Sequence, residues 1–66
     1  MARTIAVKDP DGNDDYVVVE DTASPSFFLS TGEALSLQSA ERFDEVGSGI
    51  SYYAMDDEDK EWLLGL

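Results

Sequence analysis

Two segments near the start of the chain are rich in β-branched and aromatic residues, and a polar stretch separates them. Residues 4–8 (TIAVK) and 16–20 (YVVVE) have the composition of strands, while the intervening DPDGND consists of residues that favour turns. Its Asp11-Gly12 pair includes a residue that readily adopts a positive φ, as tight hairpin turns require. The pattern therefore predicts an antiparallel hairpin in the first twenty residues.

The segment 27–38 fits two different structures. Within STGE at 30–33, the Thr-Gly pair is a second turn signal, and the Leu-Ser-Leu that follows alternates as in a strand, which favours another hairpin. The Ser and Glu of the same tetrapeptide also form a capping-box pair, and apolar residues then recur every third position, which favours a helix over about 31–46. The hairpin is the first choice, and the second helix is the alternative.

The last third of the chain predicts one more strand and a short helix. Residues 50–55 (ISYYAM) follow Gly-Ser-Gly and have strand composition, and Asp56 can cap a helix whose acidic first turn suits the helix dipole. The predicted fold is α+β, with a small antiparallel sheet of three to five strands and a short C-terminal helix in a single acidic domain, 1–66. The expected core consists of Ile5, Val7, Val17, Val19, Phe28, Leu35, Leu37, Phe43, Tyr52, Trp62 and Leu63.

Charge adds a second constraint, because the chain is far more acidic than folding requires. Fifteen Asp and Glu residues stand against four Lys and Arg, with no His, so the net charge is -11 over 66 residues. Self-repulsion of this size destabilises a compact state, and a small domain has little buried surface to offset it. We therefore expect the charge to serve a purpose: a basic partner, bound cations or a salt-rich solvent.

Composition argues against catalysis. Without His or Cys, the chain lacks the usual general base near neutral pH, the common nucleophilic triads, disulfides and thiolate metal sites. Carboxylate pairs remain, but a chain this short has little room for the cleft they need. We expect a protein that is not an enzyme, has no cofactor and folds as a monomer. No apolar stretch resembles a secretory signal or a membrane span, which predicts a cytoplasmic location.

Residues 9–20 (DPDGNDDYVVVE) partly match a calcium-binding EF-hand loop. Side chains with oxygen ligands stand at its first, third, fifth and twelfth positions, from Asp9 to Glu20. Asp14 stands where the loop needs glycine, and the flanking sequences favour strands rather than helices. We therefore interpret the segment as an acidic hairpin turn with no metal site, and calcium binding is an alternative.

The total negative charge is comparable to that of nucleic acid. A globule of this length is ~28 Å across, and duplex DNA of that length carries about 16 phosphates. A basic groove built for DNA would relieve the repulsion among the carboxylates, so the protein would compete with DNA for that groove. The candidate partner-binding residues form two groups: Asp14, Asp15, Glu20 and Asp21 in the first, and Asp56, Asp57, Glu58, Asp59 and Glu61, all expected to be exposed, in the second.

The run DDYVVVEDTASPSFF, the tail DDEDKEWLLGL, the small size and the acidity together resemble the small phage-encoded anti-CRISPR proteins, most closely inhibitors of the type I-C CRISPR system. The resemblance implies an acidic DNA mimic in the host bacterial cytoplasm. Its implied partner is the CRISPR surveillance complex, through the Cas8-type large subunit, and its effect is to block recognition of target DNA without binding nucleic acid itself. Anti-CRISPR proteins share no common fold or motif, so only a role for exposed acids carries over.

Two further interpretations stay open. Proteins of halophiles also carry surplus Asp and Glu with little Lys, so the charge is also consistent with a salt-rich cytosol. An antitoxin-like inhibitor of a basic nuclease would differ from the anti-CRISPR interpretation only in its target. A halophilic domain should loosen below molar salt, whereas a DNA mimic should be folded in dilute buffer.

Overall fold

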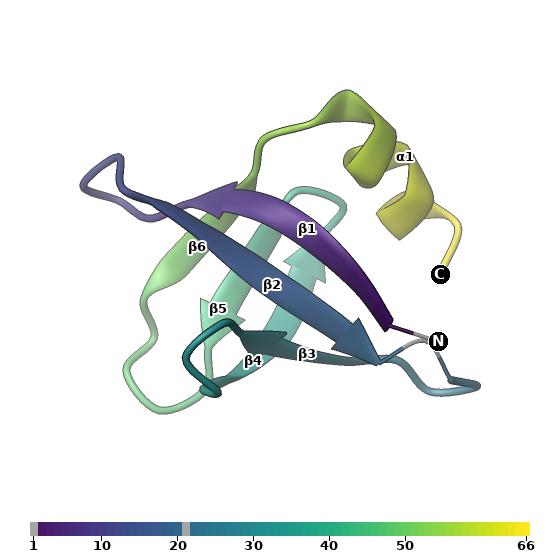
Figure 1. Ribbon diagram of the computed structural model, residues 1–66, viewed down its shortest axis with the longest axis horizontal. Helices are drawn as coiled ribbons and strands as arrows, with labels where there is room; N and C mark the ends of the chain where they lie inside the picture. Colours follow the sequence, from purple (N-terminus) through teal and green to yellow (C-terminus); the bar gives the residue numbers. More distant parts are fainter. Residues whose placement is uncertain (1, 21) are drawn as a thin grey trace.

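The computed structural model describes residues 2–20 and 22–66, and within them it contains six strands followed by one helix (Figure 1). The elements are β1 (Ala2–Lys8), β2 (Asp14–Glu20), β3 (Ser26–Leu29), β4 (Ala34–Ser39), β5 (Arg42–Glu45), β6 (Ser51–Ala54) and α1 (Asp57–Leu64). Each strand pairs antiparallel with the next, and β6 pairs with β1, so the sheet closes into a barrel. The α+β expectation of an antiparallel sheet with a short C-terminal helix is confirmed, but the expected three to five strands were too few.

Both predicted hairpin turns are present. β1 and β2 pair along their full length, from Ala2 opposite Glu20 to Lys8 opposite Asp14. Gly12 in the β1–β2 turn has a φ of 85°, and Gly32 in the β3–β4 turn has a φ of 102°. Both values lie in the left-handed region that glycine adopts without steric cost, which is why the turns form at these two positions.

The alternative helix over 31–46 is wrong, because this segment forms β4 and β5. A φ of 102° at Gly32 is incompatible with the first turn of a helix. The register places Leu37 opposite Phe43, and a bulge between Leu37 and Ser39 shifts the pairing beyond that point. Leu35 and Phe43 are buried in the same core. The spacing of three that suggested a helix thus arises from two short strands joined by a tight turn.

The core is built from side chains that alternate along every strand and meet their cross-strand partners inside the barrel. It consists of Ile5, Val7, Val17, Val19, Phe27, Leu29, Leu35, Phe43, Tyr52, Ala54 and Leu63. The expectation for Phe28 is corrected: Val17 and Val19 lie opposite Leu29 and Phe27, so Phe28 falls on the outer face and is half-buried. Leu37 and Trp62 are partly buried and pack against this core.

Helix α1 packs on the barrel through one buried face. Asp56 stands at the N-cap position, although its side chain makes no capping hydrogen bond. Leu63 is buried, and Arg3 of β1 donates a 3.0 Å hydrogen bond to the Asp59 carboxylate. The Arg3 guanidinium also lies 4.5 Å from the centre of the Trp62 ring. In the described part of the chain, no helix is long and apolar enough to cross a membrane.

Candidate acidic interface

All four basic residues of the chain form ion pairs, and most of the acids remain unpaired. The pairs are Arg3–Asp59 at 3.0 Å, Lys8–Asp14 at 2.6 Å, Arg42–Asp44 at 3.4 Å, and Lys60 with Glu41 at 3.7 Å and Asp57 at 3.8 Å. Nine acids have no basic partner among residues 2–20 and 22–66: Asp9, Asp11, Asp15, Glu20, Glu33, Glu45, Asp56, Glu58 and Glu61. The described surface therefore keeps a large excess of negative charge.

The structure does not bring the first predicted group together as one patch. Asp14 and Asp15 begin β2, whereas Glu20 ends it. A strand rises ~3.3 Å per residue, so Asp14 and Glu20 lie roughly 20 Å apart at opposite ends of the barrel. Asp21 lies outside the described residues. Residues that are close in sequence are separated here because the backbone between them is extended.

Three connections, β1–β2, β3–β4 and β5–β6, lie at the same end of the up-and-down barrel, which we call the turn end. The acids of the turn end are Asp9, Asp11, Asp14, Asp15, Glu33, Asp44 and Glu45. They come from segments up to 36 residues apart in sequence. In Figure 1, where the longest axis is horizontal, the β1–β2 turn lies at one extreme of the molecule and α1 lies toward the other.

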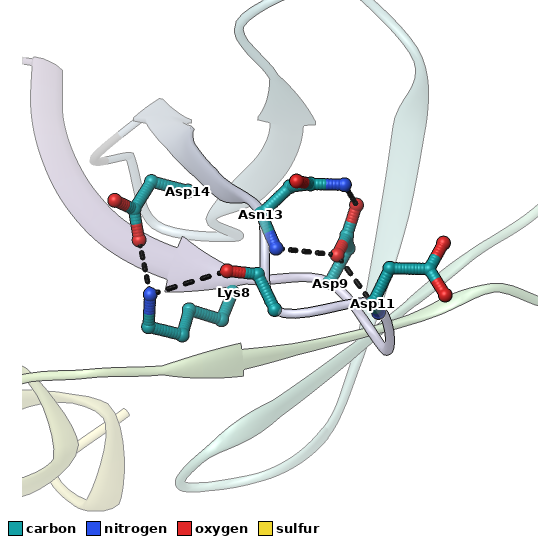
Figure 2. A network of polar contacts seen from close by, with 6 residues as sticks. Lys8, Asp9, Asp11, Asn13 and Asp14 are labelled. Carbon is teal, nitrogen blue, oxygen red and sulfur yellow. Dashed lines mark hydrogen bonds and ion pairs between the residues drawn. The ribbon is translucent and has the colours of Figure 1, made fainter.

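Hydrogen bonds within the β1–β2 turn fix its carboxylates (Figure 2). One oxygen of Asp9 accepts the backbone N–H groups of Asp11 and Asn13, at 3.0 and 2.8 Å, and the other accepts the Asn13 side-chain amide at 3.2 Å. The backbone hydrogen bond from Asn13 is the main reason that the pKa of Asp9 lies below its ordinary value. Lys8 Nζ donates to Asp14 at 2.6 Å and to the Gly12 carbonyl at 3.3 Å.

These contacts do not have the arrangement of an EF-hand calcium loop. Asp9 directs its oxygens at the N–H groups of its own turn, and Glu20 lies at the far end of β2. Within the described residues, no three acidic side chains converge closely enough to hold a metal ion. The interpretation of this segment as an acidic hairpin turn is confirmed by the pairing of β1 with β2.

Tyr52, a core residue that is only 8% exposed, directs its hydroxyl toward Glu45 of the turn end. Glu45 lies 3.5 Å from this hydroxyl, and Asp15 is held by a 2.6 Å hydrogen bond from the Ser30 hydroxyl. Burial raises the pKa of Tyr52, and the negative charges of Glu45, Asp15 and Asp9 raise it further. The sequence-based groups omitted Asp9 and Glu45, and only the strand pairing could have placed them here.

The second predicted group is on and just before α1. Asp56, Asp57, Glu58 and Glu61 are exposed, as expected, but Asp59 is 9% exposed, so the expectation that it is exposed was wrong. Asp59 lies four residues before the buried Leu63, on the face of the helix that packs on the barrel. There it pairs with Arg3, so its role is to attach the helix rather than to meet a partner.

Comparisons of the chain with protein-family models, with curated proteins and with solved structures found no match.

Proposed function

We propose that this protein is an inhibitor that acts as an acidic DNA mimic on the basic DNA-binding surface of another protein. The observation that supports the proposal is the set of nine unpaired carboxylates spread over a molecule of 30 × 24 × 17 Å. Duplex DNA 30 Å long carries roughly 18 phosphates, so the charge per unit length is of the same order. Such a decoy inhibits by occupancy, as a monomer, without a cofactor and without binding nucleic acid.

The partner that we propose is the type I-C CRISPR surveillance complex, through its Cas8-type large subunit. This choice rests on the resemblance of the sequence to small phage-encoded anti-CRISPR proteins. It agrees with the chemistry, because a subunit that contacts target DNA attracts phosphates largely through sequence-independent electrostatics. The same attraction acts on carboxylates in a similar array.

Within this proposal, the turn end makes the main contact. Hydrogen bonds already fix the carboxylates of Asp9 and Asp15, so binding orders them at little further cost in conformational entropy. Glu58 and Glu61 on α1 have no such partners among the described residues and project freely from the helix. A fixed array of acids is the better substitute for the regular phosphates of a duplex.

Two double charge reversals test the proposal with matched changes in net charge. Asp11→Lys with Glu33→Lys alters exposed acids of the turn end, and Glu58→Lys with Glu61→Lys alters exposed acids of α1. Both raise the net charge equally, and substitutions at exposed positions usually change stability by no more than ~0.5 kcal/mol each. We expect the turn-end variant to lose inhibition of target-DNA binding by the surveillance complex while the helix variant retains most of it. Full inhibition by both variants, each shown to be folded by circular dichroism, would remove the support for DNA mimicry.

A further inference from the structure

The pairing between β3 and β4 covers only part of the two strands. The two strands register only two pairs, Phe27 opposite Leu35 and Phe28 opposite Ala34. Beyond these pairs β4 continues to Ser39, whereas β3 begins at Ser26 and the chain before it is bent at residues 22–24. The strands therefore separate after a short ladder, and the separation leaves a groove between them.

This groove is apolar at its base and polar at part of its rim. It has a volume of about 450 Å³ and is lined by Pro25, Ser26, Phe27, Phe28, Ala34, Leu35, Ser36 and Leu37. Phe27 and Leu35 belong to the core, so the base of the groove reaches the barrel interior. The volume lies in the ~300–1,000 Å³ range of clefts that bind small molecules.

The part of β4 that borders the groove has backbone N–H and C=O groups that β3 does not pair. In an antiparallel pair, every second residue directs its N–H and C=O toward the neighbouring strand. The Leu29 N–H donates to the Glu33 carbonyl at 2.9 Å, so Leu29 directs its backbone groups toward the β4 side. Phe27 and Pro25, two and four residues earlier, are the next residues whose backbone groups face β4. Proline has no N–H to donate, and the ladder stops before it. Leu37 of β4, which would face Pro25, is left with its backbone groups directed into the groove.

A carboxylate flanks the groove on its β2 side. Glu20 of β2 is the cross-strand partner of Ser26 and has no basic partner among the described residues, whereas Asp44 of β5, the cross-strand partner of Ser36, is paired with Arg42 and accepts a 2.8 Å hydrogen bond from the Ser51 hydroxyl. Cross-strand partners have Cβ atoms only ~4.5–5.5 Å apart, so each acid stands beside a serine of the rim. A second copy of this chain, with its own charge of -11, is repelled from such a surface, whereas a basic segment is attracted.

We propose that the groove binds an extended basic peptide segment of another protein, which adds a strand to β4 beside Leu37. The segment places an apolar side chain in the groove, and a neighbouring Lys or Arg residue faces Glu20. Main-chain pairing supplies the affinity in this mode of recognition, and the pocket and the charges supply the specificity. Glu20 and the residues that line the groove include none of the acids of the turn end, so this surface is a second binding function beyond DNA mimicry.

A titration of the ¹⁵N-labelled protein with a synthetic seven-residue peptide of alternating Lys and Val, monitored by NMR, tests the proposal. We expect amide shifts to concentrate at residues 25–28 and 34–39. Ser26→Lys puts a cation at the rim beside Glu20 and should weaken binding about tenfold, whereas Ser48→Lys, the same change in the β5–β6 loop, should leave it unchanged. Equal weakening by both variants, or shifts confined to the turn end, would overturn the proposal, because either result indicates nonspecific attraction to the total charge.

Backbone methylation of the peptide separates strand addition from charge alone. One peptide carries N-methyl groups on its valines and another on its lysines, so each blocks the N–H groups along one edge of the extended chain. Strand addition uses one edge only, and we expect one of the two peptides to lose binding while the other keeps it. Retention by both peptides would contradict pairing with β4. A peptide of alternating Glu and Val should not bind, and binding by this peptide would show that the negative charge of Glu20 has no role.

Discussion

Neutralising Asp59 tests the contact that attaches α1 to the barrel. Its side chain is 13% exposed and accepts a 3.0 Å hydrogen bond from Arg3, whose own side chain is 34% exposed. Asp59→Asn preserves the shape of the side chain but removes its charge. The Arg3 guanidinium then keeps its contact with Trp62 and loses its ionic partner.

The size of the effect follows from this geometry. A hydrogen bond to a charged group contributes about 1.5–3 kcal/mol to stability, and the partial exposure of Arg3 places this one near the lower limit. We expect the free energy of unfolding to fall by about 1.5–2 kcal/mol. For a domain of this size, such a loss lowers Tm by roughly 10 °C.

Glu58→Gln is the matched control, because it removes the same charge from an exposed helix position without an ion pair among the described residues. Relief of repulsion in a chain of net charge -11 and loss of a favourable charge in the first turn of α1 act in opposite directions, so its stability should stay within ~0.5 kcal/mol of that of the wild type. Urea unfolding followed by circular dichroism and by the fluorescence of Trp62 measures both variants. Equal stability of the two variants would refute the assignment of Asp59 to helix attachment.

Four further results are expected. Gly32→Ala should destabilise the fold by more than ~1 kcal/mol because its φ is 102°, whereas Gly47→Ala, at a position without positive φ, should be close to neutral in urea unfolding. Because the pKa of Tyr52 is raised, its contribution to stability should be present below pH 10.0 and be lost as the pH rises through the folded-state pKa, and Tyr52→Phe should reduce the loss of stability in urea titrations at high pH. Because the pKa of Asp9 is lowered, its contribution to stability should be present above pH 3.8 and decline as the pH falls toward the folded-state pKa, which NMR of the carboxyl carbon can follow. Circular dichroism should show a folded protein in dilute buffer, and unfolding below molar salt would favour a halophilic origin of the charge.

The sequence was sufficient to predict where the hairpin turns lie and whether each long segment forms a strand or a helix. Asp11-Gly12 and Thr31-Gly32 are local signals, because the positive φ of a turn glycine depends little on the rest of the fold. The valine alternation in β2 likewise predicted the buried residues Val17 and Val19 correctly. These predictions succeeded because the determining interactions lie within a few residues.

Features that depend on pairing between distant segments could not be predicted in this way. β5 has four residues with one apolar side chain, Phe43, so no alternation marks it as a strand. The adjacent Phe27 and Phe28 leave the inward face ambiguous until β2 fixes the register. The acids of the turn end come together only because three connections meet at one end of a closed barrel. In the acidic run around Asp59, nothing in the sequence distinguishes this residue, which is the buried acid of the described part of the chain, from its exposed neighbours.

An order-of-addition mobility-shift experiment with the purified type I-C surveillance complex tests the central claim most directly. Incubation with this protein before target duplex should block DNA capture, and the block should weaken as salt rises, although less steeply than DNA binding itself. Addition after the duplex is locked in an R-loop should have little effect. A stable ternary species of complex, DNA and this protein would show that it does not occupy the DNA-binding surface, and would contradict the proposed mimicry.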